Sequence, residues 1–286
     1  MRGTIHKKIV QAGMLALLGG GTVTAAHAQS QTLAQNLLTD PFVFTAGIFL
    51  VGTDVDANLN GQSGTNPAVN FDRTFGTASD KTRGRVEGLW RINPRHSLRA
   101  AYFNNDVTRS RVLDRDIQWG DNTFNAGANV QSTTKYSVYE LAYDYTFMRT
   151  PTYEVAGSLG MHFTDLKLSL SGTGTATGGG STVTGLISRE GKIPAPLPVI
   201  GVRGGWAVAP SILLDGRLEF FKLSGGGYDG HWANAHVGAT WMFSRHFGVG
   251  LGYDKFTTRL QLEKNDFNGQ LKFGYSGLMA FVTGTF

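Results

Sequence analysis

The chain has 286 residues, of which 41% are hydrophobic and 16% are charged, and this composition fits one large domain and excludes a disordered protein or a coiled coil. It contains no cysteine, which excludes disulfide bonds, thiolate metal sites and a thiol nucleophile. The formal net charge of +5 includes Arg2, Lys7 and Lys8 of the first 28 residues, which contain no acidic residue, so the rest of the chain carries only +2. A charge this small does not indicate nucleic-acid binding.

Residues 1-28 have the organisation of a secretory signal peptide. A basic start, "MRGTIHKK", is followed by the apolar stretch "IVQAGMLALLGGGTV" and by an A-x-A site at Ala26 and Ala28. The apolar stretch is too short and too rich in glycine to span a bilayer, so we predict cleavage before Gln29 and export of the mature chain. We predict a periplasmic N-terminal segment at residues 29-41 and one folded domain at residues 42-286.

Polar and apolar side chains alternate along almost every segment after residue 42. In "TRGRVEGLWRI", for example, Arg85 and Glu87 lie on one face and Val86 and Trp90 on the other, as in a β-strand. The pattern predicts ten strands, at about residues 43-59, 81-92, 97-113, 131-148, 152-170, 197-208, 211-223, 232-244, 246-260 and 270-286. Short turns at 93-96, 148-151, 208-211 and 244-247 alternate with long loops at 60-80, 114-130, 171-196, 224-231 and 261-269.

The apolar faces carry large aromatic residues near both ends of many strands. Those beside the short turns are Trp90, Phe147, Trp206, Trp241, Phe243 and Phe247, and those toward the long loops are Tyr139, Phe163, Phe220 and Tyr253. Two aromatic girdles, an even number of strands and loops of unequal length are typical of outer-membrane barrels. Because only a closed barrel satisfies the backbone of strands in lipid, we predict an all-β, antiparallel, up-and-down transmembrane β-barrel, monomeric, in the outer membrane of a Gram-negative envelope.

The last strand ends on an aromatic residue. Counting back along "SGLMAFVTGTF" places Phe286, Val282, Ala280 and Leu278 toward lipid, with Phe286 at the periplasmic interface. A terminal aromatic residue of this kind resembles the signal that outer-membrane proteins present to the barrel-assembly machinery. In outline the mature chain resembles the small-barrel group of OmpA-type, OmpW-type and porin-like proteins, which implies a structural or weakly permeable role in contact with membrane lipid.

The polar faces of the predicted strands point into the barrel. Parity assigns to the lumen Arg83, Arg85, Glu87, Arg91, Glu140, Asp144, Arg203, Asp215, Arg217, Glu219 and Asp254, five basic and six acidic residues. A barrel of eight strands is filled by its own side chains, so ten strands leave little room. Two interpretations remain open: a salt-bridged plug, or a narrow path for small solutes. The mixing of opposite charges along each strand, without a ring of one sign, favours the plug.

Two acidic motifs lie at the predicted outer rim. Asp114 and Asp116 open the second long loop in "LDRDIQWGD", and Asp229 and His231 lie in "GYDGHWAN" of the fourth. Residues i and i+2 of an extended chain point the same way, so each motif can present two side chains to one cleft. Two carboxylates facing an Asp-His pair could hold and deprotonate a water molecule.

Both motifs resemble the omptin outer-membrane proteases, ten-stranded barrels with Asp-x-Asp on the second outer loop and Asp-x-His on the fourth. The strand "LPVIGVRGGW" and a W-x3-P-x2-S-x2-A-A spacing are also similar, the latter at Trp90, Pro94, Ser97, Ala100 and Ala101. The resemblance implies an alternative function as an endopeptidase, with Asp114 and Asp116 binding the attacking water and Asp229 orienting His231 as its base. Strand alternation, however, predicts that His231 points outward unless a bulge resets the register.

Other features of the sequence give weaker signals. We predict no metal site and no cofactor, because the histidines have no ligand spacing, and no G-x-S-x-G elbow supports a serine hydrolase. At the outer rim, Arg109, Arg111 and Arg115 are predicted either to contact lipopolysaccharide phosphates or to pair with the neighbouring aspartates.

Overall fold

The computed structural model describes residues 31–57, 69–70, 74–75, 81–119, 122–178, 181–225, 228–264 and 267–286. The predicted signal peptide and most of the first predicted loop lie outside these residues. No helix in the described part of the chain is long and apolar enough to cross a membrane.

In the described ranges, the structure has one short helix followed by thirteen strands. The elements are α1 (Leu33–Thr39), β1 (Phe42–Ala57), β2 (Val69–Asn70), β3 (Lys81–Arg91), β4 (His96–Val112), β5 (Ile117–Trp119), β6 (Asn122–Phe124), β7 (Asn129–Arg149), β8 (Tyr153–Gly178), β9 (Ser181–Ala209), β10 (Ile212–Gly225), β11 (Tyr228–Met242), β12 (Phe247–Lys264) and β13 (Phe267–Thr285).

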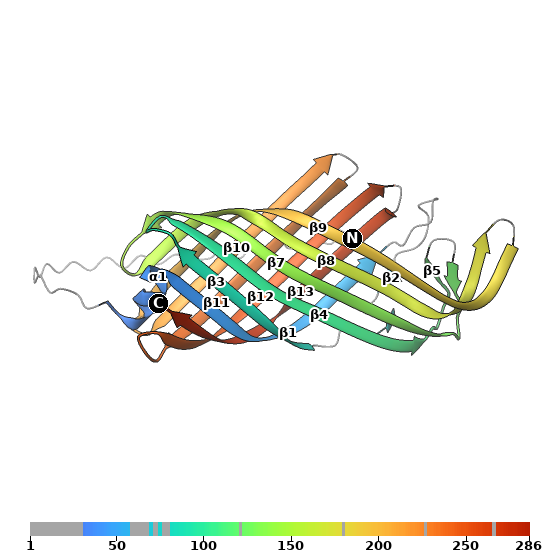
Figure 1. Cartoon of the computed structure of the whole chain (residues 1–286), viewed down its shortest axis with the longest axis horizontal. Coiled ribbons are helices and arrows are strands. Elements are labelled where there is room, and N and C mark those ends of the chain that lie inside the picture. Colours follow the sequence, from blue (N-terminus) through green and yellow to red (C-terminus); the bar gives the residue numbers. More distant parts are fainter. Residues whose placement is uncertain are drawn as a thin grey trace, which may run out of the picture. The chain divides into compact units, whose positions relative to one another are not determined.

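Ten of these strands close into a barrel. The neighbours run β8, β7, β4, β3, β1, β13, β12, β11, β10 and β9, all pairing antiparallel, and a β8–β9 ladder closes the ring. β2 pairs with β1, while the β5–β6 hairpin adds to β8. The tilted strands and the position of α1 beside the C-terminus are visible in Figure 1. The predicted fold class and the strand number are therefore confirmed.

Besides the predicted loop that contains β2, four predicted loops contain strand residues in the structure. β8 and β9 pair continuously from Tyr153 and Trp206 to Gly178 and Ser181, so most of the predicted loop at 171-196 is an extended hairpin. Glycine and threonine suggested a loop there, but small residues in alternation also fit a β-ladder. The same holds at 224-231 and 261-269, where β10 extends to Gly225 and β11 begins at Tyr228, and where β12 extends to Lys264 and β13 begins at Phe267. The predicted loop at 114-130 contains β5 and β6.

Exposure alternates along the strands as the sequence pattern requires. All ten residues of the two predicted aromatic girdles are at least 41% exposed, whereas inward residues such as Phe256 and Phe49 are at most 1% exposed. Phe286 is 57% exposed, exchanges two backbone hydrogen bonds of 3.0 Å with Phe42, and packs against the rings of His246 and Phe247. The terminal aromatic side chain therefore lies on the outer face, as predicted.

Away from the short turns, the described strands separate into two walls. The β9–β10 ladder ends at Ile200 and Phe220, and the β3–β4 ladder ends at Arg85 and Phe103. Beyond these points, β4, β7, β8 and β9 form a first wall, and β10 to β13 with β1 form a second wall (Figure 1). The edge of β9 carries proline at alternate positions, at 194, 196 and 198, which offer no N–H to β10.

Candidate functional site

A network of ion pairs fills the interior of the barrel near the short turns. At its centre, Arg99 of β4 is 6% exposed and binds Glu140 of β7. The Nη2 atom of Arg99 lies 2.7 Å from Oε1 of Glu219 on β10, and its Nε atom lies 3.5 Å from Oδ2 of Asp144. Arg217 approaches both glutamates, at 3.4 Å from Glu219 and 3.7 Å from Glu140. Three strands, β4, β7 and β10, are thereby cross-linked through the lumen.

The network extends to the short-turn end through Arg203. Its guanidinium lies 2.6 Å from Oδ2 of Asp144 and 2.6 Å from Oε1 of Glu154, and Glu154 also pairs with Arg91 at 3.1 Å. Each of these carboxylates is at most 2% exposed. Buried charges of this kind are tolerated only when opposite charges are in contact, which is the arrangement found here.

A second branch of the network lies under β3, β11 and β12. Arg85 lies 2.5 Å from Glu87 and 3.3 Å from Asp254. The imidazole of His236 connects Asp254 and Asp215, each at 3.1 Å. The lumen near the short turns is therefore crossed by opposite charges in contact and not by a ring of like charges.

All but one of the predicted lumen residues join these ion pairs. The exception, Arg83, donates from Nε to Asn105 at 2.8 Å and so also points inward. Sequence reasoning missed Arg99, Glu154 and His162, although all three have the inward parity of their strands. The same alternation rule, applied through the full length of β4 and β8, would have found them.

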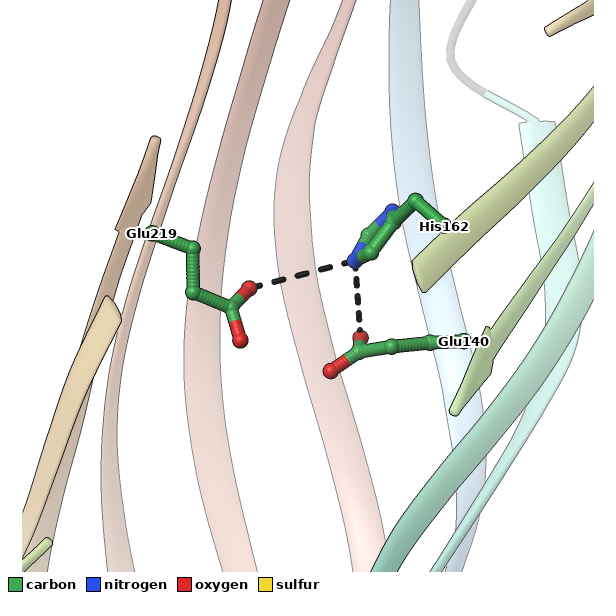
Figure 2. A group of neighbouring side chains, drawn as sticks. All are labelled: Glu140, His162 and Glu219. Carbon is green, nitrogen blue, oxygen red and sulfur yellow. Dashed lines mark ion pairs between the residues drawn. The ribbon is translucent and has the colours of Figure 1, made fainter. Parts of the chain in front are cut away.

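Figure 2 shows how Glu140, His162 and Glu219 lie within the network. The Nε2 atom of His162 is 3.1 Å from Oε2 of Glu140 and 3.8 Å from Oε2 of Glu219, and His162 is only 1% exposed. One nitrogen and two carboxylate oxygens are donors that zinc accepts, and they lie within 4.8 Å of one another.

The charges around these three residues disfavour a divalent cation. Both carboxylates are already in contact with Arg99 and Arg217, so their two negative charges are balanced by two guanidinium groups. A bound metal would add two positive charges beside both arginines without displacing either. The ring of His162 instead packs against Trp232 and Phe256, with centroids 5.2 and 5.9 Å away. We therefore assign the three residues to the internal charge network.

An aromatic layer covers the charge network on the side of the long hairpins. It consists of Phe49, Phe103, Tyr136, Trp232, Phe256, Phe273 and Tyr275, each at most 5% exposed. Neighbouring rings are 4.9–6.2 Å apart, as between Tyr136 and Phe273 at 4.9 Å and between Phe103 and Tyr275 at 5.0 Å. The guanidinium of Arg85 lies 5.5 Å from the ring centroids of Phe49 and Phe103, which joins the two layers by cation–π contacts.

Beyond the aromatic layer, apolar side chains of the two walls pack against each other. Those of the first wall include Leu166 and Leu197, and those of the second include Leu271 and Phe273. The space between them is a cavity of only about 10 Å³. The part of the lumen that the structure describes is thus occupied along its length by charged, aromatic and aliphatic layers in turn.

Helix α1 covers the short-turn end. Leu37 and Leu38 pack against Leu213 and Met242 of the barrel wall. Arg91 donates to the backbone carbonyls of Leu37 and Asp40 at 2.7 and 2.9 Å. Asp40, at the end of the helix, also forms a two-bond pair with Arg245, at 2.6 and 2.9 Å. Between α1 and the charge network is a cavity of about 150 Å³. The predicted N-terminal segment therefore closes one mouth of the barrel.

The rim residues of the peptidase hypothesis lie at the long-hairpin end but are not joined. Asp114 and Asp116 are exposed after β4, and Oδ1 of Asp116 accepts a hydrogen bond of 2.7 Å from the backbone N–H of Ala126. Asp229 and His231 are exposed on β11, where they alternate with the buried residues Gly230 and Trp232. His231 thus faces outward, as its parity predicts. Among the described residues, no hydrogen bond or ion pair connects the two motifs.

The three predicted lipopolysaccharide contacts lie at the same end. Arg109 and Arg111 have the inward parity of Phe103 and Val107 on β4, and Nη1 of Arg111 donates to the carbonyl of Thr74 at 3.2 Å. Arg115 is exposed in the following bend. Their contact with lipopolysaccharide stays a prediction.

A closed, ten-stranded, up-and-down barrel with an apolar outer face defines the fold of the outer-membrane β-barrel proteins. The solved outer membrane protease OmpT from Escherichia coli shares this fold: its TM-score is 0.58 at 12% sequence identity, over 86% of this chain and 96% of that chain.

Two further solved structures are similar with lower scores. They are the toluene transporter TodX of Pseudomonas putida, with TM-score 0.39, 8% identity and coverage of 90% and 93% of the two chains, and Ail of Yersinia pestis, with TM-score 0.35, 9% identity and coverage of 85% and 98%. No family model and no curated protein sequence matches the chain.

Proposed function

We propose that the protein is an integral outer-membrane β-barrel with a structural role, whose lumen is sealed and whose two walls stand at the cell surface. In this orientation α1 and the short turns lie in the periplasm. The observation that carries the proposal is the buried network around Arg99, which cross-links β4, β7 and β10 through the barrel axis. The aromatic layer and α1 support it, because each blocks the same axis at another level.

The sealed state is favoured by the cost of separating its charges. An ion passing the level of Arg99 would have to separate its guanidinium from Glu140, Glu219 and Asp144. Parting a buried pair costs about 3–5 kcal/mol, and a passing ion meets several pairs in succession. A porin-like path would need these side chains to move together.

Planar-bilayer recording tests this proposal. The purified, folded protein should give no discrete conductance steps at 100 mV in 1 M KCl, while an open porin in the same apparatus gives stable steps. Reproducible steps from the unmodified protein would favour the narrow charged pore. Recording at low ionic strength as well would distinguish an ion-selective path from leakage at the barrel–lipid boundary.

The second candidate is an omptin-like endopeptidase, which the presence of both acidic motifs at the long-hairpin end of the barrel supports. Activity would require the hairpin of β10 and β11 to turn His231 inward toward Asp116. A dibasic fluorogenic peptide offered to the refolded protein and to Asp116→Asn tests this function. Cleavage by the unmodified protein that the variant loses would establish the peptidase, whereas equal background from both would dismiss it.

Export and assembly are further parts of the proposal. We propose that the signal peptide is removed before Gln29, that the barrel-assembly machinery recognises the strand ending at Phe286, and that the barrel is a monomer surrounded by outer-membrane lipid and lipopolysaccharide. Intact mass measurement of the protein from purified outer membranes tests the cleavage site. A mass that includes residues 1-28, or recovery in the soluble fraction, would contradict this part.

A further inference from the structure

Four basic residues form a row across the outer face of the second wall. Lys222 on β10 lies directly opposite His231 on β11, His231 opposite Arg259 on β12, and Arg259 opposite Lys272 on β13. All four side chains are exposed and have outward parity. With adjacent strands about 4.8 Å apart, the row is about 15 Å long. A fifth base, Lys255, is exposed on the same face of β12.

The row lies just beyond the apolar band of the barrel. On β12 the outward residues are apolar from Phe247 to Tyr253 and become polar at Lys255, and on β10 the last apolar one is Phe220. From Phe247 to Arg259 the chain rises by about 30 Å for strands tilted near 40°, compared with an apolar band of about 25 Å. Arg259 is thus at the level where lipid headgroups meet water, and the rest of the row lies within about 10 Å of this level along the membrane normal.

Acidic residues do not neutralise this row. Asp56 on β1 lies opposite Lys272 at one end, Asp54 is two residues away, and Asp229 lies two residues from His231. None of the four basic residues forms an ion pair with any acid among the residues that the structure describes. The residues directly opposite Lys222, His231 and Arg259 on neighbouring strands are all members of the row, so none of them is acidic.

The first wall differs in this respect. Its outward lysines are paired: Lys135 lies 2.7 Å from Asp106, and Lys167 lies 2.6 Å from Glu190. The hydrogen bond from Lys167 lowers the pKa of the Glu190 carboxyl below its ordinary value. Both walls therefore carry outward lysines beyond the apolar band, but among the described residues only those of the second wall have no acid in contact.

Arg259 and Lys272 are like charges directly opposed on two strands, which destabilises the sheet unless an anion lies against them. A surface hollow of about 500 Å³ adjoins the row and is lined by His231, Lys255, Arg259 and Lys272 together with Asp54. Gly52 and Gly274 also line it, and their missing side chains leave room for a ligand group. The positive charge of the row, the hollow beside it and its position at the edge of the apolar band together indicate that it binds an anionic group of a membrane lipid.

We propose that Lys222, His231, Arg259 and Lys272, with Lys255, bind the phosphates of lipopolysaccharide in the outer leaflet. The length of the row suits a headgroup with more than one phosphate. Because the row lies on the lipid-facing side of the wall, a membrane lipid has more direct access to it than a soluble anion. This site is separate from the lumen network and from Arg109, Arg111 and Arg115. It rests on the proposed membrane orientation, but it does not require the lumen to be sealed.

Binding of purified lipopolysaccharide to the detergent-solubilised protein tests the site. The test variant is Lys222→Gln, Arg259→Gln, Lys272→Gln, and the matched control is Lys135→Gln, Lys167→Gln, Lys192→Gln, which removes three positive charges from the first wall, each within 4 Å of an acid. Each base near an anionic membrane surface contributes about fivefold to affinity, so the test variant should bind about 100-fold more weakly and the control about as well as the unmodified protein.

Three comparisons decide the outcome. Lipopolysaccharide should raise the thermal unfolding midpoint of the unmodified protein and of the control but not of the test variant, and in the absence of lipopolysaccharide the test variant should unfold no earlier than the unmodified protein. Dephosphorylated lipopolysaccharide, phosphatidylglycerol micelles and inorganic phosphate should bind at least tenfold more weakly than intact lipopolysaccharide. The proposal would be overturned if both variants lost the same amount of affinity for lipopolysaccharide. It would also be overturned if dephosphorylated lipopolysaccharide or phosphatidylglycerol bound as tightly as intact lipopolysaccharide.

Discussion

Replacement of Arg99 by methionine perturbs the centre of the charge network. The substitution keeps much of the side-chain volume but removes the contacts to Glu140, Glu219 and Asp144. Asp144 keeps Arg203 at 2.6 Å and Glu219 keeps Arg217 at 3.4 Å, whereas Glu140 keeps only Arg217 at 3.7 Å and His162 at 3.1 Å. The change therefore leaves one buried carboxylate poorly compensated.

Loss of one partner from a buried pair costs about 3–5 kcal/mol, so Arg99→Met should lower the free energy of unfolding by that amount. Urea unfolding of the refolded protein in detergent, followed by tryptophan fluorescence, measures it. The matched control Lys135→Met removes an ion pair to Asp106 whose side chains are 50% and 54% exposed, and should cost at most about 1 kcal/mol.

A second substitution tests the cause of the loss. Glu140→Gln removes the carboxylate that Arg99→Met leaves uncompensated, so the double variant should recover at least half of the lost stability. If Arg99→Met costs no more than Lys135→Met, or if Glu140→Gln makes it worse, the network does not stabilise the barrel in the way described.

Three further outcomes follow from other parts of the structure. Asp40→Ala removes the pair with Arg245 that holds the end of α1, and we expect faster proteolysis of residues 31-41 with no change in the barrel, measured by mass spectrometry after limited digestion. Gly277→Val should destabilise or prevent folding, because a Cβ atom at this position would clash with the carbonyl oxygen of Leu50; a gel shift between heated and unheated samples detects the folded barrel. Phe286→Ala should reduce the amount of barrel in outer membranes without changing its stability once refolded in vitro, as immunoblotting and urea unfolding would show.

The barrel was predictable because lipid imposes one rule on all its strands. Period-two alternation, as in "TRGRVEGLWRI", fixes which side chains meet lipid, and the aromatic girdles mark both ends of the strands. The lumen assignments followed from the same rule, since Arg85, Glu87 and Asp254 needed only parity to be placed inside. A local pattern with a single period is enough for these features.

Features that depend on contacts between distant segments were not predictable. Helix α1 has only seven residues and is held by Arg91, Arg245 and the carbonyl of Pro210, which lie on three different strands or turns. The separation into two walls depends on where the β9–β10 ladder stops, and the sequence offers only the alternate prolines before Ile200 as a sign. Whether Asp116 and His231 meet also depends on tertiary geometry, because they lie on separate hairpins.

The basic row shows the same limit. Lys222, His231, Arg259 and Lys272 are far apart in the sequence, and only the register of three ladders brings them side by side. Parity alone could have placed each of them outward, but not at one level. The register between strands cannot be read from a single sequence.

The most direct test of the account concerns which side chains touch lipid. Two variants that each keep one of the five tryptophans, with the others replaced by phenylalanine, would be reconstituted into vesicles of lipids brominated along their acyl chains. Trp241 is 55% exposed on the outer face and Trp232 is 2% exposed inside, so bromine should quench most of the fluorescence of Trp241 and little of that of Trp232. Equal quenching of both, or stronger quenching of Trp232, would contradict a barrel with a lipid-facing exterior and a sealed interior.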